Sequence, residues 1–181
     1  KLVVDNDLDF GIAFDGDADR GVFIDDFGRV ISGSMMTVLI AEFLSSQNTE
    51  FKVVHNVNVS PHALKMMKDN NIELYKCKVG HSNIKKMMRD VDADFGGEHS
   101  AHFYYRDNFY ADSAILTLLI FMKIISNNKE KISSIIDNYN FPPSSGEINF
   151  SVEDINESIS KIESIFEGEF DQTDGLSCLH R

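Results

Sequence analysis

Three aspartates at alternate positions are the most distinctive chemical group in this sequence. Asp15, Asp17 and Asp19 lie between an apolar run over 10–14 and another over 21–24. Such runs, rich in Phe, Ile and Val, predict buried strands, so the aspartates should occupy the turn between two strands. Three carboxylates this close repel one another unless a cation neutralises them. Oxygen ligands suit a hard divalent ion such as Mg²⁺ or Ca²⁺.

Two other interpretations of this segment stay open. An EF-hand loop also places acids at its positions 1, 3 and 5, but counting from Asp15 its position 6 would be Arg20, where Gly is needed, and position 12 would be Asp26, where Glu is usual. A solvated acidic turn is the other alternative. Arg20 adds a planar cation suited to a phosphate or a carboxylate, which favours a catalytic metal loop.

A second polar loop spans 78–82, between an expected strand and an expected helix. Lys78 and His81 flank Gly80 there. A cation, an imidazole and the free N–H groups of a helix N-terminus can converge on an anion. His81 could also act as a general acid or base, since its unperturbed pKa is near neutrality. Either residue alone also fits an ordinary surface.

A third loop, 96–102, contains Glu98, His99, Ser100 and His102. The Gly-x-Ser-x-Gly pattern of a serine-hydrolase elbow is absent around Ser100. A zinc site from the two histidines would need a third ligand, and the helical His-Glu-x-x-His pattern is missing. A carboxylate, a hydroxyl and an imidazole together suit sugar hydroxyls, which offer paired donors and acceptors. A polar surface turn remains the alternative.

Bulk composition limits the class of protein. The chain has 181 residues, 43% of them hydrophobic, and a formal net charge of -12, which disfavours nucleic acid and anionic membranes as partners. Two cysteines, Cys77 and Cys178, do not suggest a disulfide framework. No apolar run of about twenty residues or signal peptide is recognisable, so we expect a cytoplasmic protein. The start at Lys1 without Met and the end soon after a turn signal favour a piece of a longer protein.

The expected elements alternate between strands and helices, which indicates βαβ units and a mixed sheet. Ser34 is the expected N-cap of the first helix, and Ser60-Pro61 opens the second. Strands are expected at 10–14, 21–24, 30–31, 52–57, 72–75 and 102–105. Helices are expected at 35–45, 61–70, 113–126 and 130–139, and a further short helix should follow the 78–82 loop and end near residue 89. A Pro/Ser/Gly linker at 141–146 precedes an expected strand at 147–152 and a helix at 153–166, too little to close a core alone.

The three loops, in this order, resemble those of one family, the α-D-phosphohexomutases, and in particular phosphomannomutase/phosphoglucomutase. Segment 15–20 resembles the family's metal-binding loop, and 78–82 its Lys-x-Gly-His-Ser loop. Segment 97–102 resembles its sugar-recognition loop, Gly-Glu-x-Ser-Gly/Ala-His. Runs 103–107 and 145–149 look most like the phosphomannomutase branch, and the resemblance covers essentially the whole chain.

The resemblance implies an α/β fold: a mixed-sheet βαβ domain of phosphohexomutase type, flanked by partial domains of a four-domain enzyme. Residues 1–31 would be the closing strands of domain 2 with the metal loop, 32–140 the sugar-recognition domain 3, and 141–181 the truncated start of domain 4. The phosphoserine loop of domain 1 and the phosphate loop of domain 4 would lie outside this sequence. Some relatives have Lys where this chain has Asn58, so no catalytic role is carried over to it.

The implied activity moves a phosphoryl group between C1 and C6 of mannose or glucose phosphate, through a hexose 1,6-bisphosphate and the enzyme phosphoserine. By resemblance, the catalytic residues are His81, Lys78 and Arg20. The metal ligands for Mg²⁺ are Asp15, Asp17 and Asp19, and the substrate-binding residues are Glu98, Ser100 and His102. The isolated piece is expected to be inactive. A magnesium-dependent sugar phosphatase and a non-catalytic calcium-binding module stay open as alternatives.

Overall fold

A five-stranded mixed sheet, with strand order β5-β4-β6-β7-β8, organises the middle of the chain. In the computed structural model, which describes residues 1–46, 48 and 50–180, strand β4 pairs in parallel with β5 and β6, whereas β6–β7 and β7–β8 are antiparallel. The strands are β4 (Lys52–Asn56), β5 (Glu73–Cys77), β6 (Phe95–Gly97), β7 (Phe103–Tyr105) and β8 (Ala111–Asp112). The expected mixed α/β sheet is confirmed.

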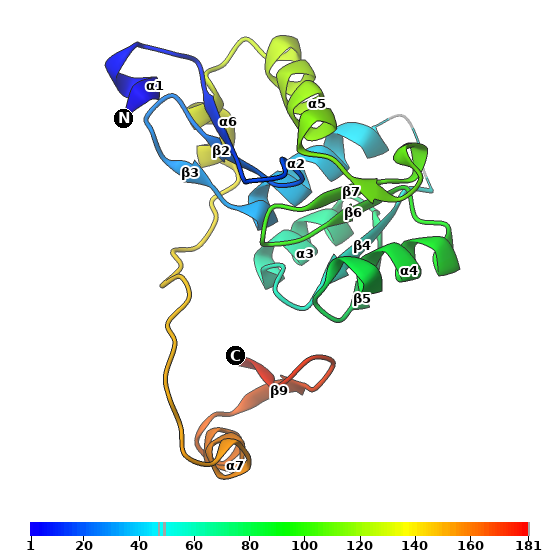
Figure 1. Cartoon of the computed structure of the whole chain (residues 1–181), viewed down its shortest axis with the longest axis vertical. Helices are drawn as coiled ribbons and strands as arrows, with labels where there is room; N and C mark the ends of the chain where they lie inside the picture. Colours follow the sequence, from blue (N-terminus) through cyan, green and yellow to red (C-terminus); the bar gives the residue numbers. More distant parts are fainter. Residues whose placement is uncertain (47, 49, 181) are drawn as a thin grey trace. The chain divides into compact units, whose positions relative to one another are not determined.

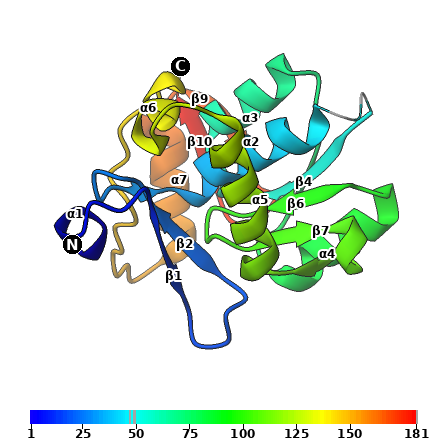
Figure 2. The same ribbon diagram turned by 90° about the horizontal axis from the view of Figure 1, so that it is seen from above.

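Helices cover both faces of this sheet because its strands alternate buried side chains between two cores (Figure 2). Helices α2 (Gly33–Ser45) and α3 (Pro61–Asp69) lie on one face, and α4 (His81–Val91) lies on the other. Phe103 and Tyr105 belong to the first core, whereas Tyr104 packs in the second with Ile84 and Met88 of α4. Neighbouring tyrosines of one strand therefore have different surroundings.

The N-terminal part forms a separate three-stranded antiparallel sheet, with order β1-β2-β3, after the short helix α1 (Leu2–Asp5). Its strands are β1 (Gly11–Phe14), β2 (Gly21–Ile24) and β3 (Val30–Ile31). Phe23 of β2 is fully buried, and its ring centroid lies 4.7 Å from that of Phe121 in α5 (Ala114–Asn127). The expectation of a buried first strand was wrong: β1 is an edge strand, and Phe14 is 42% exposed.

The turn between β2 and β3 is joined to α6 (Ile132–Asn138) by hydrogen bonds and an ion pair. Figure 1 shows α6 beside β2 and β3. Asp25 is 1% exposed and accepts hydrogen bonds from the backbone N–H groups of Phe27 and Arg29 at 3.0 and 2.8 Å. Asp26 accepts from the N–H and hydroxyl of Ser133 at 2.8 and 3.0 Å. These contacts fix the end of the N-terminal sheet that lies away from the three aspartates.

Most expected elements are present, with shifted ends. Helix α2 begins two residues earlier than expected, at Gly33. Its N-cap is Ser32 rather than Ser34, and the Ser32 hydroxyl accepts the N–H of Met35 at 3.2 Å. Strands β6 and β8 were not expected; β6 lies in a Gly-Gly segment and β8 has two residues. A 3₁₀ helix, η1 (Arg106–Asn108), joins β7 to β8.

Residues 142–181 form a second compact unit, apart from residues 1–141. It contains α7 (Ile155–Ile165), β9 (Gly168–Asp171) and β10 (Ser177–His180). The expected strand at 147–152 was wrong, because this segment pairs with no strand in the described part of the chain.

The proposed division of the chain into domains at residues 31 and 140 stays a prediction. No helix among the described residues is both long and apolar enough to cross a membrane.

Candidate functional site

The three aspartates lie in the tight connection between β1 and β2. One carboxylate oxygen from each of Asp15, Asp17 and Asp19 lies within 4.8 Å of the others. Ala18, between the last two, has a positive φ of 60° and donates its N–H to the carbonyl of Asp15 at 3.3 Å. The turn thus points the carboxylates toward one another, against their mutual repulsion.

Arg20 holds the first aspartate. Its Nε lies 2.6 Å from Oδ2 of Asp15, and its backbone N lies 3.2 Å from Oδ1. The side-chain hydrogen bond from Arg20 lowers the pKa of Asp15, and the same bond raises the pKa of Arg20. Within the described chain, neither Nη atom of Arg20 has a hydrogen-bond partner. Its remaining N–H donors can therefore bind a phosphate.

Asp19 differs from its neighbours in having an oxygen without a partner. Its Oδ1 is enclosed and accepts no hydrogen bond among the described residues. The side-chain nitrogens beside it are Arg20 Nε at 3.9 Å and His102 Nε2 at 3.8 Å, both beyond hydrogen-bond distance. Burial raises the pKa of Asp19, and the carboxylates nearby add to this, whereas His102 opposes it. An enclosed carboxylate oxygen with no donor is the state expected of a cation ligand. The loop therefore fits a hard divalent cation.

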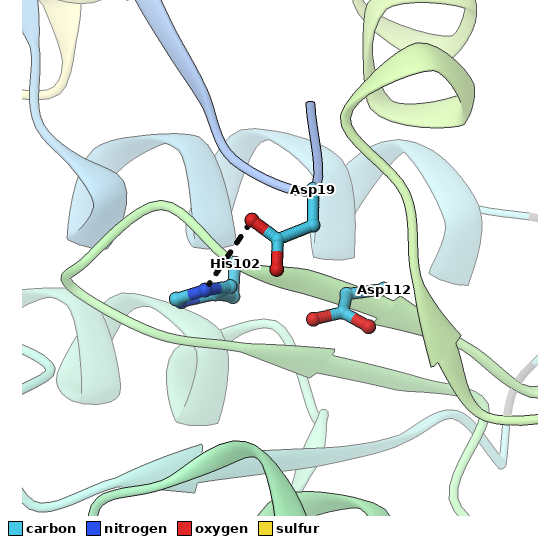
Figure 3. Close-up of side chains that lie close together, drawn as sticks. All are labelled: Asp19, His102 and Asp112. Atoms are coloured by element: carbon cyan, nitrogen blue, oxygen red, sulfur yellow. Dashed lines mark ion pairs between the residues drawn. The ribbon is translucent and has the colours of Figure 1, made fainter. Parts of the chain in front are cut away.

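His102 and Asp112 face Asp19 from the neighbouring sheet (Figure 3). One ligand atom from each of these three residues lies within 4.8 Å of the others. Asp112 was missed in the sequence, since β8 is too short to show periodicity. Its Oδ1 pairs with Lys85 Nζ of α4 at 2.8 Å, which engages one of its two oxygens. This corner joins the aspartate loop to the 96–102 loop, the expected metal and sugar loops.

Glu98 lies deeper than expected for a residue that contacts sugar. It is 2% exposed; its Oε2 accepts from Asn56 Nδ2 at 2.6 Å and its Oε1 from the Tyr104 hydroxyl at 2.5 Å. Each carboxylate oxygen has a second lone pair for a further donor. Ser100, by contrast, is exposed, and its Oγ lies 3.1 Å from His102 Nδ1. Asn56, at the carboxyl end of β4, was also missed, although the ends of strands are where ligands collect.

The first turn of α2 packs directly under this loop. A Cβ on Gly33 would lie 2.3 Å from the carbonyl oxygen of His99 and 2.6 Å from that of Glu98, so only glycine allows this approach. The hydroxyl of Ser34 lies 2.9 Å from His99 Nδ1 and accepts the N–H of Ser60 at 3.0 Å. Ser34, expected as a helix cap, instead anchors the loop.

Lys78 and His81, unlike Arg20 and His102, make no hydrogen bond or ion pair with the aspartate loop in the described chain. Both are exposed, at the junction of β5 and α4, where Gly80 has φ +115° and His81 is the first helical residue. The structure thus brings Asp15, Asp17, Asp19, Arg20, Glu98, Ser100 and His102 to one region, whereas Lys78 and His81 lie exposed at the start of α4.

Comparison with known proteins gives a consistent family. Residues 32–140 match the phosphoglucomutase/phosphomannomutase α/β/α domain III. The chain is 35% identical over 98% of its length to a phosphohexose mutase of Xanthomonas campestris pv. campestris and 34% identical over 98% to a phosphomannomutase of Escherichia coli. It spans 40% of the length of each of these relatives.

Solved structures agree on the fold. A phosphoglucomutase/phosphomannomutase family protein from Burkholderia thailandensis superposes with a TM-score of 0.84, at 24% identity, over 99% of this chain and 39% of that one. An N-acetylphosphoglucosamine mutase from Aspergillus fumigatus, solved with GlcNAc-6P and magnesium, superposes with a TM-score of 0.68 at 16% identity, over 94% of this chain and 38% of that one. With the domain match over residues 32–140, these findings show that the chain belongs to the phosphoglucomutase/phosphomannomutase family of the α-D-phosphohexomutase superfamily.

Proposed function

We propose that this chain is the metal- and sugar-binding part of a phosphomannomutase/phosphoglucomutase. The full enzyme would transfer phosphate between C1 and C6 of mannose or glucose phosphate, through a hexose 1,6-bisphosphate and a phosphoserine outside this chain. Residues 1–31 would belong to its domain 2, 32–140 to domain 3 and 141–181 to domain 4. The chain alone, without the phosphoserine, would not turn over.

One observation carries the proposal: the aspartate loop meets the 98–102 loop, with Asp19 Oδ1 3.8 Å from His102 Nε2. A cation site can bind the phosphoryl group, and a hydroxyl-binding loop at the same corner can bind the sugar that receives it. The two reactants are then held next to each other. Holding both reactants in place is the main catalytic need of phosphoryl transfer. A separate calcium module would not require the second loop.

The residues of this chain would then act as follows. Asp15, Asp17 and Asp19 would hold Mg²⁺, which when bound neutralises charge on the phosphoryl oxygens. Arg20, held at its Nε by Asp15, would present its Nη groups to a phosphate.

The sugar would be held by other residues. Ser100, which is exposed, would bind a sugar hydroxyl, and His102 beside it would orient that hydroxyl. Glu98 would accept a hydroxyl through its remaining lone pairs. Lys78 and His81, exposed at the start of α4, would bind the distal phosphate, and His81 is the candidate general acid or base.

The test is a phosphorus NMR experiment on the full-length polypeptide. It is incubated with Mg²⁺, a catalytic amount of hexose 1,6-bisphosphate and mannose 1-phosphate, and then with glucose 1-phosphate. Mannose 6-phosphate should appear without inorganic phosphate, and the two rates give the sugar preference. Asp17→Asn should lower the rate by at least tenfold, since a bound metal is worth several kcal/mol of charge stabilisation. Asp69→Asn, an exposed aspartate paired with Lys65 on α3, is the matched control and should not change the rate.

Other outcomes would redirect the proposal. Release of inorganic phosphate in place of the mutase product would favour a sugar phosphatase. Tight Ca²⁺ binding with no response to sugar phosphates would favour the calcium module. An equal loss of rate in the Asp17 and Asp69 variants would contradict the metal assignment.

A further inference from the structure

We infer that Tyr104 is a positioning residue that holds the predicted sugar-binding carboxylate of Glu98 and, through Lys85 and Asp112, the corner occupied by Asp19 and His102. The inference rests on the proposed function and extends it to Tyr104, Lys85 and Asp112, to which no role was assigned from the sequence. Tyr104 makes no predicted contact with substrate itself. Its two contacts, one through the hydroxyl and one through the ring, carry the argument.

The hydroxyl of Tyr104 fixes one side of Glu98. It donates to Oε1 at 2.5 Å, Tyr104 is fully buried, and Glu98 is 2% exposed. Burial, and then the hydrogen bond to Glu98, raise the pKa of Tyr104, so this hydroxyl remains a donor at neutral pH. With Asn56 on Oε2, it confines the carboxylate to one orientation. Without the Tyr104 hydroxyl, Oε1 would lose the hydrogen bond that it accepts at this buried position, and the carboxylate could rotate.

The ring of Tyr104 supports a second group of contacts. Lys85 Nζ lies 5.5 Å from the ring centroid, within the range of a cation–π interaction, and 2.8 Å from Asp112 Oδ1. The side chains of Lys85 and Asp112 are only 25% and 10% exposed, so solvent screens this pair weakly. Tyr104 and Asp112 are also direct partners in the β7–β8 register. The ring thus determines where Lys85 holds Asp112.

Asp112 transmits this placement to the metal corner. One of its carboxylate oxygens lies within 4.8 Å of a ligand atom of Asp19 and of His102. Figure 3 shows the three side chains close together. Lys85 lies one turn after His81 on α4, so the same lysine connects this corner to the helix that begins at the 78–82 loop. One buried tyrosine therefore links all three predicted loops. Reacting groups must be placed within a fraction of an ångström, so such a support should affect substrate affinity.

The adjacent tyrosine offers a matched control. Tyr105 is 4% exposed and its hydroxyl lies 2.8 Å from Thr117 Oγ1, on the opposite face of the sheet and away from Glu98. Tyr104→Phe and Tyr105→Phe each remove one buried hydroxyl from the same strand. If both residues serve only stability, the two variants should behave alike.

The experiment compares these variants in the full-length enzyme. We measure KM and kcat for mannose 1-phosphate, and the Kd of a hexose 1,6-bisphosphate by calorimetry. Tyr104→Phe should raise KM and Kd by about tenfold, the typical worth of a hydrogen bond to a charged group. Tyr105→Phe should leave both constants unchanged. A purely structural loss lowers the active fraction and hence the apparent kcat, but leaves KM unchanged. Unchanged KM and Kd in Tyr104→Phe, or equal changes in both variants, would overturn the inference.

A second pair of variants decides the matter if Tyr104→Phe does not fold. Lys85→Gln removes the charge over the ring, whereas Lys86→Gln removes the adjacent lysine, 76% exposed and paired with Asp90. The first should raise KM severalfold and the second should not; equal effects would refute the inference.

A wild type that binds the bisphosphate without isomerising hexose phosphate would refute the proposed function alone, and the Kd comparison would still test Tyr104. A wild type that does neither would refute both.

Discussion

Replacing Gly33 by alanine tests whether α2 supports the predicted sugar loop. Local propensity favours the change, because alanine is better than glycine within a helix by about 1 kcal/mol. The tertiary structure opposes it. The new Cβ would lie 2.3 Å from the carbonyl oxygen of His99, 2.6 Å from that of Glu98 and 2.7 Å from the carbonyl carbon of His99. All three are backbone atoms, so no side-chain rotation can relieve the contact.

The structure gives the size of the required movement. Ordinary contacts of a Cβ begin at 3.4 Å, so the carbonyl of His99 must withdraw by 3.4 minus 2.3, or about 1.1 Å. Overpacking of this kind costs about 1–3 kcal/mol. Taking the upper end because backbone must move, and subtracting about 1 kcal/mol for helix propensity, we expect a net loss of about 2 kcal/mol. With a urea slope of about 2 kcal/mol/M, the unfolding midpoint should fall by about 1 M.

Urea unfolding of this chain, followed by circular dichroism, is the first assay. Gly16→Ala is the control for stability, because a Cβ there would meet nothing within 4 Å, and its midpoint should not change. The second assay is mutase kinetics in the full-length enzyme. A displacement of about 1 Å at Glu98 and His99 should lower kcat/KM by about 10²-fold. If Gly33→Ala is as stable as the wild type or more stable, the close approach of α2 to this loop does not exist and the reasoning fails.

Two further substitutions test the electrostatics of the hairpin. Burial raises the pKa of Asp26, but the hydrogen bonds from Ser133 lower it more, so the net pKa of Asp26 is lowered. The ionised carboxylate therefore stabilises the fold at neutral pH. This contribution is lost as the pH falls through the pKa of the folded state. Asp26→Asn should therefore cost about 1–2 kcal/mol at pH 7 in urea unfolding, with the difference narrowing below about pH 4; a constant difference would contradict this. Asp19→Asn should weaken Mn²⁺ binding, measured by electron paramagnetic resonance, and raise the unfolding midpoint of the metal-free chain, because it removes one of the crowded carboxylates. Unchanged Mn²⁺ affinity would show that Asp19 is not a ligand.

Local features of this protein were predictable because they depend on neighbours in the sequence. The alternating aspartates between two apolar runs predicted a hairpin with a carboxylate cluster, and the cluster is present. Ser60, followed by Pro61, predicted the start of α3, and its side chain does accept the N–H of Ala63. Each of these depends on the dihedral angles and hydrogen bonds of a few consecutive residues.

Predictions failed where the deciding partner is distant in the chain. Segment 147–152 has the composition of a strand but finds no partner strand among the described residues, and β8 has a partner although its two residues show no pattern. Ser34 has the residue type of a cap, yet its hydroxyl serves His99, sixty-five residues away in sequence. Sequence patterns record preferences of the backbone and not the contacts that satisfy them.

The sequence by itself determined the chemistry available to this protein: which residues could bind a cation, an anion or a hydroxyl, and the hairpin and helices that carry them. Only the tertiary structure decided how these groups meet. It brings Asp19 to His102 and Asp112, buries Glu98 between Asn56 and Tyr104, and leaves Lys78 and His81 exposed. The physical reason is that side-chain placement depends on long-range packing of two sheets and their helices, which no local run of residues encodes.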